Sequence, residues 1–238
     1  MTYQIGELVP IKRYWVARNG NIPERFWGRD FADIKRDTGQ DIPDIKDWVS
    51  DLLAGKIIKN PGGLGETGVG ILLEGDPGRG KTTTAVTTIM EIVRQLPDLP
   101  ADIARVFHYA PTDCGFNTRG VYYLTMPDFI NQKKAVWDAD PDEKRELQRE
   151  LDGFYGRAKE DWLNVRVLIL DDLGKEYGSE FNKVTFDDIL RARYDKGLPT
   201  IITTNKPLAQ WKKDYSEAMH SFAREAFRRV TLEGKDQR

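Results

Sequence analysis

The amino-acid sequence predicts an α/β fold in which a parallel sheet lies between layers of helices. Short apolar strands alternate with helical stretches through most of the chain. A glycine-rich loop of the form G-x-x-x-x-G-K-T, at residues 75–82, follows one such strand and opens a helix. A later strand, 165–170, is apolar at nearly every position and is followed by two acids, which is typical of a strand buried on both faces of a sheet.

Composition limits the classes of protein to which the chain can belong. Its 238 residues fit one domain with small appendages, and its net charge of −2 means that any nucleic-acid contact must come from a local patch. The single cysteine, Cys114, excludes a disulfide framework, and two histidines, His108 and His220, are too few for a histidine-rich metal site. No apolar run approaches the roughly 20 residues of a membrane span, and the N-terminus lacks a signal-peptide pattern. We therefore expect a cytoplasmic protein without membrane contact.

The first hundred residues are expected to contain one strand and two helices. Residues 1–22 are interpreted as an N-terminal extension, either a short strand packed on the main domain or a partner-binding arm. A helix is expected over 43–54, because its apolar residues recur at helical spacing and Gly55 follows its end. Residues 69–74 form an apolar strand, and 83–96 form the helix that follows the glycine-rich loop.

The middle of the chain begins with an irregular stretch. Prolines and glycines punctuate residues 97–120, which we interpret as an insertion that contains a strand at 106–109. Residues 121–125 are aromatic and β-branched and predict a strand. A helix is expected over 126–137. Another is expected over 140–163, because an aspartate followed by proline begins it, and the glycines within it are candidate interruptions.

The last third continues the alternation. After the apolar strand at 165–170, a helix is expected over 179–196 and a strand over 199–204. A final helix at 215–229 then leads into a short strand at 230–232.

The glycine-rich loop is the main chemical signal. Its glycines allow tight turns that point backbone N–H groups inward, and these groups attract phosphate together with the helix N-terminus. Lys81 would reach the β- and γ-phosphates of a nucleotide, and the Thr82 hydroxyl would hold Mg²⁺. The predicted nucleotide-binding residues of this region are Gly75, Asp76, Pro77, Gly78, Arg79, Gly80, Lys81, Thr82 and Thr83.

Two acids and an amide are expected to complete this site. Asp171, at the end of the apolar strand, would bind Mg²⁺, and Asp172 would orient or deprotonate the attacking water. Strand-end acids can also cap helices, but the upstream phosphate loop favours the metal site. Asn205, after the next strand, would contact the γ-phosphate or the water; its structural alternative is a turn asparagine before Lys206.

Arginines and lysines supply further candidates. Arg191 and Arg193 are expected on the helix before the Asn205 strand, and Arg224, Arg228 and Arg229 on the last helix. A subunit interface that places an arginine at a neighbour's γ-phosphate would explain one or two of them, and a solvated helix face would explain the rest. The basic residues that either contact nucleic acid or lie on a solvated face are Lys133, Lys134, Lys144, Arg145 and Arg149.

The order of these motifs resembles that of a known family. The motifs are Ile22-Pro23-Glu24-Arg25-Phe26, the phosphate loop, Val121 to Asp128, Leu168-Ile169-Leu170-Asp171-Asp172-Leu173-Gly174, and Arg193-Tyr194 before Pro199 to Asn205. Together they resemble the DnaC-like helicase loaders of the AAA+ ATPases and the related IstB-like transposition ATPases, over roughly residues 22–238. The runs Asp-Asp-Leu-Gly and Pro-Thr-Ile-Ile-Thr-Thr-Asn are the most specific parts.

The resemblance implies an AAA+ domain over 23–238, with a five-stranded parallel sheet in the order 5-1-4-3-2 flanked by helices. It implies ATP and Mg²⁺ as cofactors. Single-stranded DNA and a replicative hexameric helicase are the implied partners, with a homo-oligomer in the ATP-bound state. By motif match, the resemblance implies that Asn205 senses the γ-phosphate. It implies that Arg224 is the arginine finger and that Arg228 is a second phosphate-sensing arginine. An offset of one helical turn in the alignment would exchange the roles of Arg224 and Arg228. The segment around Phe26 and Trp27 would lie near the adenine.

The chain departs from the family pattern in three places. Asp172 stands where many AAA+ proteins have glutamate, residues 97–120 look like an insertion, and residues 1–22 are short for a separate helicase-binding domain. We therefore carry three hypotheses: an ATP-dependent helicase loader that uses hydrolysis as a release switch, an IstB-like transposition ATPase acting on duplex DNA, and a nucleotide-binding adaptor with little turnover. For the loader, the candidates for gripping DNA just after the apolar strand are Lys175, Tyr177 and Lys183, whose alternative is an exposed loop.

Overall fold

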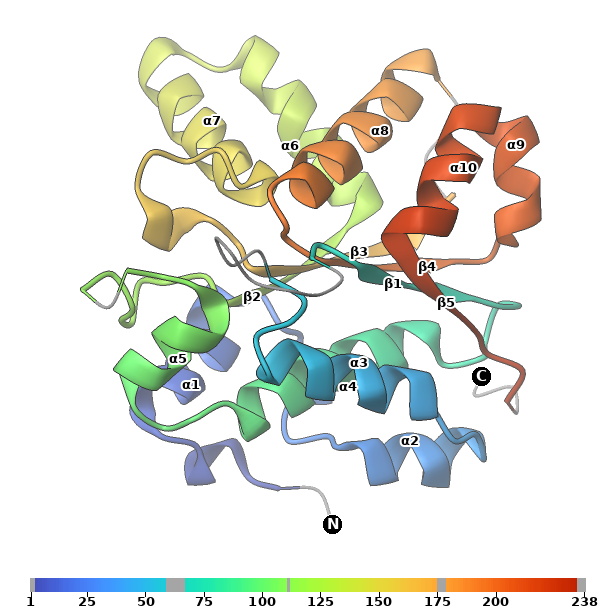
Figure 1. The fold of residues 1–238 in the computed structure, drawn as a ribbon. Helices are drawn as coiled ribbons and strands as arrows, with labels where there is room; N and C mark the ends of the chain where they lie inside the picture. Colours follow the sequence, from blue (N-terminus) through green and yellow to red (C-terminus); the bar gives the residue numbers. More distant parts are fainter. Residues whose placement is uncertain (1–2, 59–66, 111, 175–178, 235–238) are drawn as a thin grey trace.

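A five-stranded parallel sheet lies at the centre of the chain (Figure 1). The computed structural model describes residues 3–58, 67–110, 112–174 and 179–234. The strand order is β2-β3-β4-β1-β5, which is the predicted order 5-1-4-3-2 read from the opposite edge. The strands are β1 Gly70–Glu74, β2 Val121–Thr125, β3 Val167–Leu173, β4 Thr200–Thr204 and β5 Phe227–Thr231.

Helices cover both faces of the sheet and form a three-layer molecule (Figure 1). On one face lie α1 Pro10–Tyr14, α2 Phe31–Thr38, α3 Pro43–Leu53, α4 Lys81–Gln95 and α5 Pro100–Phe107. On the other lie α6 Met126–Asp138, α7 Pro141–Tyr155, α8 Glu180–Asp195, α9 Trp211–Asp214 and α10 Glu217–Ala226. Within the described ranges, no helix combines the length and the apolar character that crossing a membrane requires.

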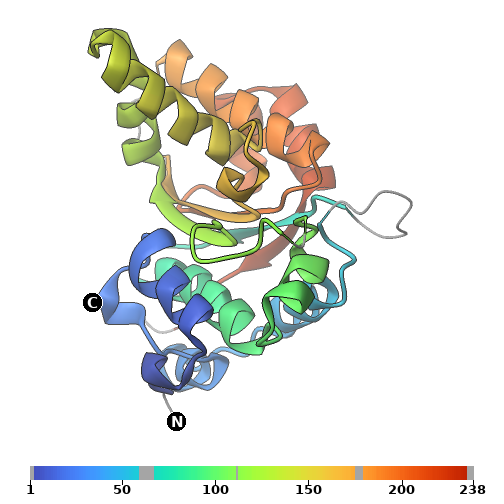
Figure 2. The same cartoon turned by 90° about the vertical axis from the view of Figure 1, so that its left-hand side faces the viewer.

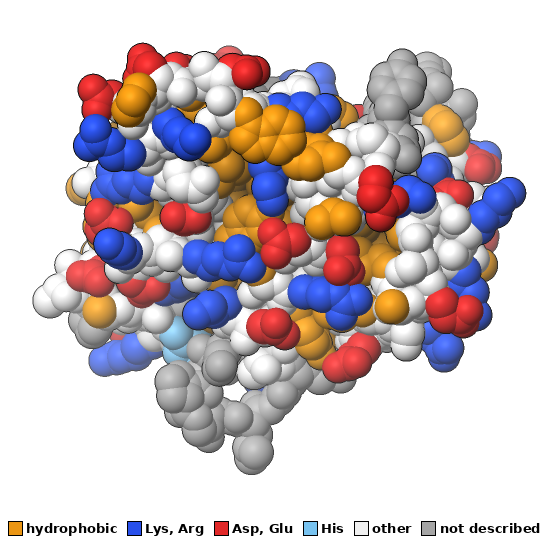
Figure 3. Space-filling model, turned by 90° about the horizontal axis from the view of Figure 1, so that it is seen from above, with side chains coloured by type: hydrophobic (Ala, Val, Ile, Leu, Met, Phe, Trp, Pro, Cys, Tyr) orange, Lys and Arg blue, Asp and Glu red, His pale blue; other side chains and the backbone are white. Residues whose placement is uncertain are grey.

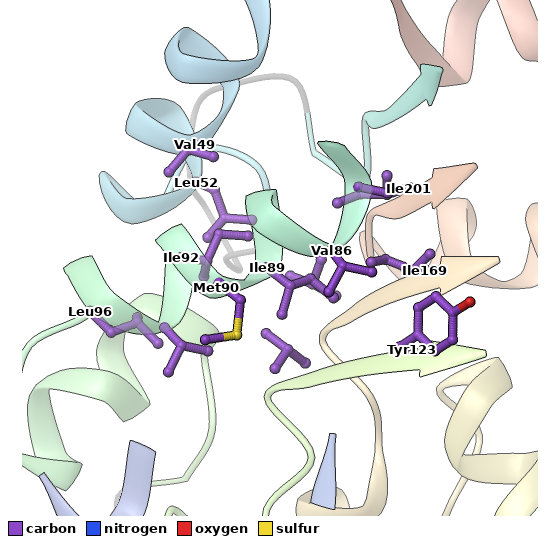
Figure 4. Close-up of a cluster of buried hydrophobic side chains, with 14 of the residues drawn as sticks. Val49, Leu52, Val86, Ile89, Met90, Ile92, Leu96, Tyr123, Ile169 and Ile201 are labelled. Atoms are coloured by element: carbon purple, nitrogen blue, oxygen red, sulfur yellow. The ribbon is translucent and has the colours of Figure 1, made fainter. Parts of the chain in front are cut away.

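The sheet is buried on both faces because successive side chains of each strand point to opposite layers. In β1, Ile71 and Leu73 belong to the hydrophobic cluster that contains α4, whereas Leu72 belongs to the cluster of the other layer. Figure 4 shows the first cluster, in which Val86 of α4 lies over Ile169 of the sheet. This packing holds α4, and with it the glycine-rich loop, against the sheet.

The N-terminal residues differ from the expectation. The strand that was one alternative for 1–22 is wrong: a 3-10 turn at Ile5–Glu7, α1 and a π-helical turn at Trp15–Asn19 together occupy most of the described part of this segment. Trp15 is buried and stacks on Phe107 of α5, with ring centroids 5.9 Å apart. Figure 2 shows α1 on the same side of the sheet as α4 and α5. The described part of this segment therefore packs into the core and does not project from it.

Lys12 shows how closely the segment is joined to the phosphate-loop helix. Its side chain is buried, and its Nζ donates hydrogen bonds to the carbonyl of Leu96 and, at 2.7 Å, to Oδ1 of Asp98. Leu96 is the C-cap residue that directly follows α4, where carbonyl groups lack helical partners and a positive charge is stabilising. A residue of α1 thus caps the C-terminal end of α4.

The expected strand at 106–109 is also wrong. Residues 100–107 form α5, which begins with Pro100 and buries Ile103, Ala104 and Phe107 on one face. His108 ends the helix with a φ of 52°, in the left-handed region. The short apolar run was ambiguous because a buried helix turn and a buried strand have similar composition.

Two predicted helices end earlier than expected. The helix expected over 140–163 ends at Tyr155, and Gly156 follows it in the left-handed conformation with a φ of 73°. The last helix, α10, ends at Ala226 and not at 229. Strand β5 begins at Phe227 because it pairs along the whole length of β1. Arg228 and Arg229 therefore lie on a strand, which corrects their predicted helical position.

Candidate nucleotide-binding site

A cavity of about 830 Å³ lies at the carboxyl ends of β1, β3 and β4. Open α/β sheets bind ligands at this edge, because the loops that follow the strands converge there. The lining residues are Arg25, Phe26, Pro77, Gly78, Gly80, Lys81, Thr82, Thr83, Tyr123, Thr125, Asp171, Asp172 and Asn205. The structure thus brings the predicted phosphate loop, the two acids and Asn205 to one cavity.

The phosphate loop joins β1 to α4. Its first residue, Gly75, has a φ of 152°, and a Cβ atom there would lie only 2.4 Å from the carbonyl oxygen of Leu232. Only glycine therefore lets the chain after β5 approach the loop this closely. Asp76 and Arg79 belong to the loop but lie outside the cavity wall, and Arg79 donates a hydrogen bond of 2.6 Å to the carbonyl of Gly234.

The side chain of Lys81 lies over the loop that carries it. Its Nζ donates to the carbonyl oxygens of Gly75 and Asp76, both at 2.7 Å. Because Lys81 is the first residue of α4, its ammonium group and the helix N-terminus add their positive potential at the same point. This arrangement fits the binding of an anion with several phosphate oxygens.

Thr82 and Asp171 meet across the cavity. The Thr82 hydroxyl lies 3.0 Å from each carboxylate oxygen of Asp171, and the aspartate side chain is buried at the end of β3. Hydroxyl and carboxylate oxygens are the ligands that Mg²⁺ prefers, and Mg²⁺ usually binds through one or two protein groups together with substrate phosphates. These two side chains therefore fit a magnesium ion bound with a nucleotide.

An irregularity in β3 places Asp172 in the wall of the cavity. The pairing register of β3 with β4 shifts between Leu170 and Leu173, and Asp172 between them has a φ of 61°. Its backbone N–H donates to the Thr203 hydroxyl at 2.9 Å, which holds this left-handed conformation. Backbone strain of this kind in a non-glycine residue is concentrated at functional sites. Asn205, one residue beyond β4, lies in the same wall.

Two residues for which no individual role was predicted contact the Asp171 carboxylate, although both belong to motifs on which the family resemblance rests. The Tyr123 hydroxyl lies 2.8 Å from Oδ2, and the Thr203 hydroxyl donates to Oδ1 at 2.5 Å. Burial is the larger cause and the nearby Asp171 charge the second, and together they raise the pKa of Tyr123 far above its usual range. Strand alternation across β2 and β4 was the signal that could have found them, because both strands flank β3.

The segment before α2 also reaches the cavity. Arg25 and Phe26 lie in its wall, and the guanidinium of Arg25 lies 4.8 Å from the centre of the Phe26 ring. Trp27, which was grouped with Phe26 in the prediction, is not part of this wall and donates its indole N–H to the carbonyl of Ile22.

Arg224 and Arg228, the two arginines predicted to contact phosphate, lie apart from the phosphate loop of their own chain. Arg224 and Arg228 line a second cavity, of about 450 Å³, together with Val69 and Phe227 at the starts of β1 and β5. The phosphate loop follows the other end of β1. Arg228 forms an ion pair of 2.8 Å with Asp51, at the end of α3.

Of the remaining arginines, two form ion pairs. Arg229 lies 3.2 Å from a carboxylate oxygen of Glu74, and Arg191 lies 2.8 Å from Asp187. Arg193 is completely buried, which excludes it as a group that reaches a neighbouring subunit and corrects its candidacy.

The fold and the cavity together define the class of the protein. The chain has the predicted fold, a parallel five-stranded sheet flanked by helices, and solved structures of other proteins share this fold. It is similar to the crystal structure of the DnaC helicase loader, with a TM-score of 0.55 and 23% identity over 89% of this chain and 100% of that one. The crystal structure of DnaI matches with a TM-score of 0.56 and 20% identity, over 91% and 94% of the two chains.

The sequence comparisons agree with this class. A family model described as IstB-like ATP binding protein matches residues 120–224, which is less than half of the chain. The matched residues include Asp171, Asp172 and Asn205 but not the phosphate loop. No curated protein matches the chain by sequence. The predicted resemblance to the DnaC and IstB group is therefore confirmed in the fold and in this family model.

Proposed function

We propose that the protein is a cytoplasmic, ATP-dependent loader of a replicative hexameric helicase. The observation that carries the proposal is the convergence of the phosphate loop, the Thr82–Asp171 contact and Asp172 in one cavity of a DnaC-like fold. This set of groups suits hydrolysis of a nucleoside triphosphate, because each one addresses a different part of that reaction.

In this proposal each residue of the site has one role. Lys81 and the N-terminus of α4 would bind the phosphates, and Thr82 and Asp171 would hold the magnesium ion. When bound, the ion supplies positive charge that neutralises the phosphate oxygens. Asp172 orients the attacking water and accepts its proton, and Asn205 hydrogen-bonds the water or the γ-phosphate.

The positions of Arg224 and Arg228 support the proposal that the protein forms an oligomer in the ATP-bound state. Because Arg224 lies toward the start of the strands, it is separated from the phosphate loop of its own chain by the length of β1. An exposed arginine in that position suits the γ-phosphate of a neighbouring subunit. Arg228, beside it in the same cavity, is the second candidate for this contact.

The face formed by α6, α7 and α8 supports contact with single-stranded DNA. Figure 3 shows this face, where hydrophobic side chains lie among charged side chains of both signs. Trp137 of α6 is 64% exposed and packs on Phe181 of α8, with ring centroids 4.9 Å apart, and Val184, three residues after Phe181 on α8, is 58% exposed. Lys134 lies 5.8 Å from the centre of the Phe181 ring. Aromatic rings flanked by cations bind single strands by base stacking and phosphate attraction.

The predicted DNA-binding residues differ in whether their charges are already paired with acids of the chain. Lys133, Arg145 and Arg149 form ion pairs with acids of the chain. Lys134 and Lys144 are exposed, and no ion pair involves them among the described residues. Lys183 lies on α8 between Phe181 and Val184. Lys175 and Tyr177 lie outside the described residues.

Replacing Trp137 with alanine is expected to weaken binding of single-stranded DNA by about tenfold, because stacking of one base contributes about 1–3 kcal/mol. Stability should change little, since the side chain is mostly exposed. Fluorescence anisotropy of a labelled oligothymidine measures the affinity. The matched control is Phe116→Ala, which removes an aromatic ring that is 52% exposed beside Tyr14, on the opposite side of the sheet. Equal affinities for both variants and the wild type would remove this face from the proposal.

Capture of the cognate replicative helicase on the immobilised protein tests the proposed function. We expect retention with ATP, weaker retention with ADP, and loss of the nucleotide effect in Lys81→Ala, because that variant lacks the cation that binds the phosphates. Identical retention of helicase by the wild type in ATP, in ADP and without nucleotide would contradict the loader function.

The family-model match favours one alternative, an IstB-like transposition ATPase that assembles on duplex DNA. The two functions differ in the form of DNA that the protein binds. The loader is expected to prefer single strands, and the transposition ATPase is expected to prefer duplex. The same anisotropy assay with single-stranded and duplex forms of one sequence distinguishes them.

A further inference from the structure

We propose that Tyr123 is a positioning residue that fixes the Asp171 carboxylate in the orientation required for binding magnesium. The inference rests on the proposed function, since it assumes that Asp171 holds the ion in a nucleotide site. The observation that carries it is the 2.8 Å hydrogen bond from the Tyr123 hydroxyl to Oδ2 of Asp171, inside the cavity wall.

The carboxylate of Asp171 is held from both sides of its strand. Tyr123 on β2 donates to one oxygen, and Thr203 on β4 donates to the other at 2.5 Å. Strands β2 and β4 are the two neighbours of β3 in the sheet. With both oxygens fixed, rotation of the carboxylate about its Cβ–Cγ bond is blocked, and its remaining lone pairs face Thr82, whose hydroxyl lies 3.0 Å away.

The Tyr123 side chain is itself held firmly. It is 9% exposed, and Figure 4 shows its ring within the cluster beneath α4, with its hydroxyl oxygen at the edge of the cluster. Its backbone N–H donates to the carbonyl of Gly20 at 2.8 Å, and its carbonyl accepts from Nδ2 of Asn21 at 2.9 Å. The N-terminal segment therefore secures the strand that carries this hydroxyl.

Removal of a hydrogen-bond partner behind a metal ligand typically lowers metal affinity about 10–100-fold, because the ligand loses its preset orientation. A residue that only fills the core would change stability but would leave the magnesium requirement unaltered. The magnesium dependence of nucleotide binding therefore separates a positioning role from a packing role.

Titration of magnesium into the protein with a fluorescent ADP analogue tests the inference on Tyr123→Phe, which keeps the ring and removes only the hydroxyl. We expect the half-saturating magnesium concentration to rise about tenfold, with nucleotide affinity in EDTA unchanged. The matched control is Tyr122→Phe, whose ring packs on Phe154 in the other layer. It should titrate like the wild type.

The outcomes separate this inference from the proposed function. If Tyr123→Phe titrates like the wild type, Tyr123 does not position Asp171 and the inference is overturned. If Tyr122→Phe shows the same shift as Tyr123→Phe, the effect is general packing and the inference is overturned as well. Absence of magnesium-dependent nucleotide binding in the wild type would overturn the proposed function together with the inference.

Discussion

Asp172→Asn is expected to lower ATP turnover by about 100-fold or more, since removal of a general base typically costs a factor of about 10²–10⁴. Asparagine has nearly the same shape as aspartate, so the left-handed backbone at this position and its hydrogen bond to Thr203 should persist. ATP affinity is expected to remain that of the wild type, because the phosphate-binding groups, Lys81 and the loop, are unchanged.

Phosphate release at steady state measures the turnover of this variant, and equilibrium binding of a fluorescent ATP analogue measures its affinity. Asp142→Asn is the control, because it removes an exposed carboxylate of α7 far from the cavity. Equal turnover in Asp172→Asn and in the wild type would exclude Asp172 as the base. If the wild type itself shows no turnover with single-stranded DNA, the protein is a nucleotide-binding adaptor.

Arg193→Leu is expected to destabilise the fold by about 3 kcal/mol or more, because it leaves several buried acceptors without a donor. Arg193 is completely buried, and all five of its N–H groups donate hydrogen bonds, which is the full number that arginine has. The acceptors are the carbonyl oxygens of Phe154, Val165, Arg166 and Pro199 and the hydroxyl of Thr200. The Arg193 side chain thus connects the end of α7 to the starts of β3 and β4.

Urea denaturation followed by circular dichroism measures this loss of stability. Arg191→Leu, two residues earlier on α8, is the control. Its guanidinium is 41% exposed and forms a surface ion pair with Asp187, so we expect a change below about 1 kcal/mol. A loss of the same size in the two variants would show that the hydrogen bonds of Arg193 do not support the sheet.

Local sequence signals were sufficient for the buried central strands and the phosphate loop. Strands buried on both faces are continuous apolar runs, so β1, β3 and β4 could be found from composition alone. The loop at 75–82 could be found because phosphate binding requires glycines and a lysine at fixed spacing. The order of the strands came from the family resemblance and not from any local pattern.

The remaining features depend on which distant residues meet. Burial of Arg193 follows from carbonyl groups of three separate segments, which no sequence window contains. The helical N-terminal segment was missed because its apolar residues bury against α5, an element that was itself read as an irregular insertion. Tyr123 was visible only as a strand residue, because its contact with Asp171 depends on the pairing of β2 with β3.

Release of a captured helicase after ATP is added tests most directly the claim that hydrolysis at this site is a switch. ATP alone is expected to retain the helicase, but with single-stranded DNA present to stimulate hydrolysis the wild-type complex is expected to dissociate after ATP addition. The Asp172→Asn complex should persist under the same conditions, because the variant binds ATP but cannot remove the γ-phosphate. Dissociation of both complexes at the same rate would contradict the account.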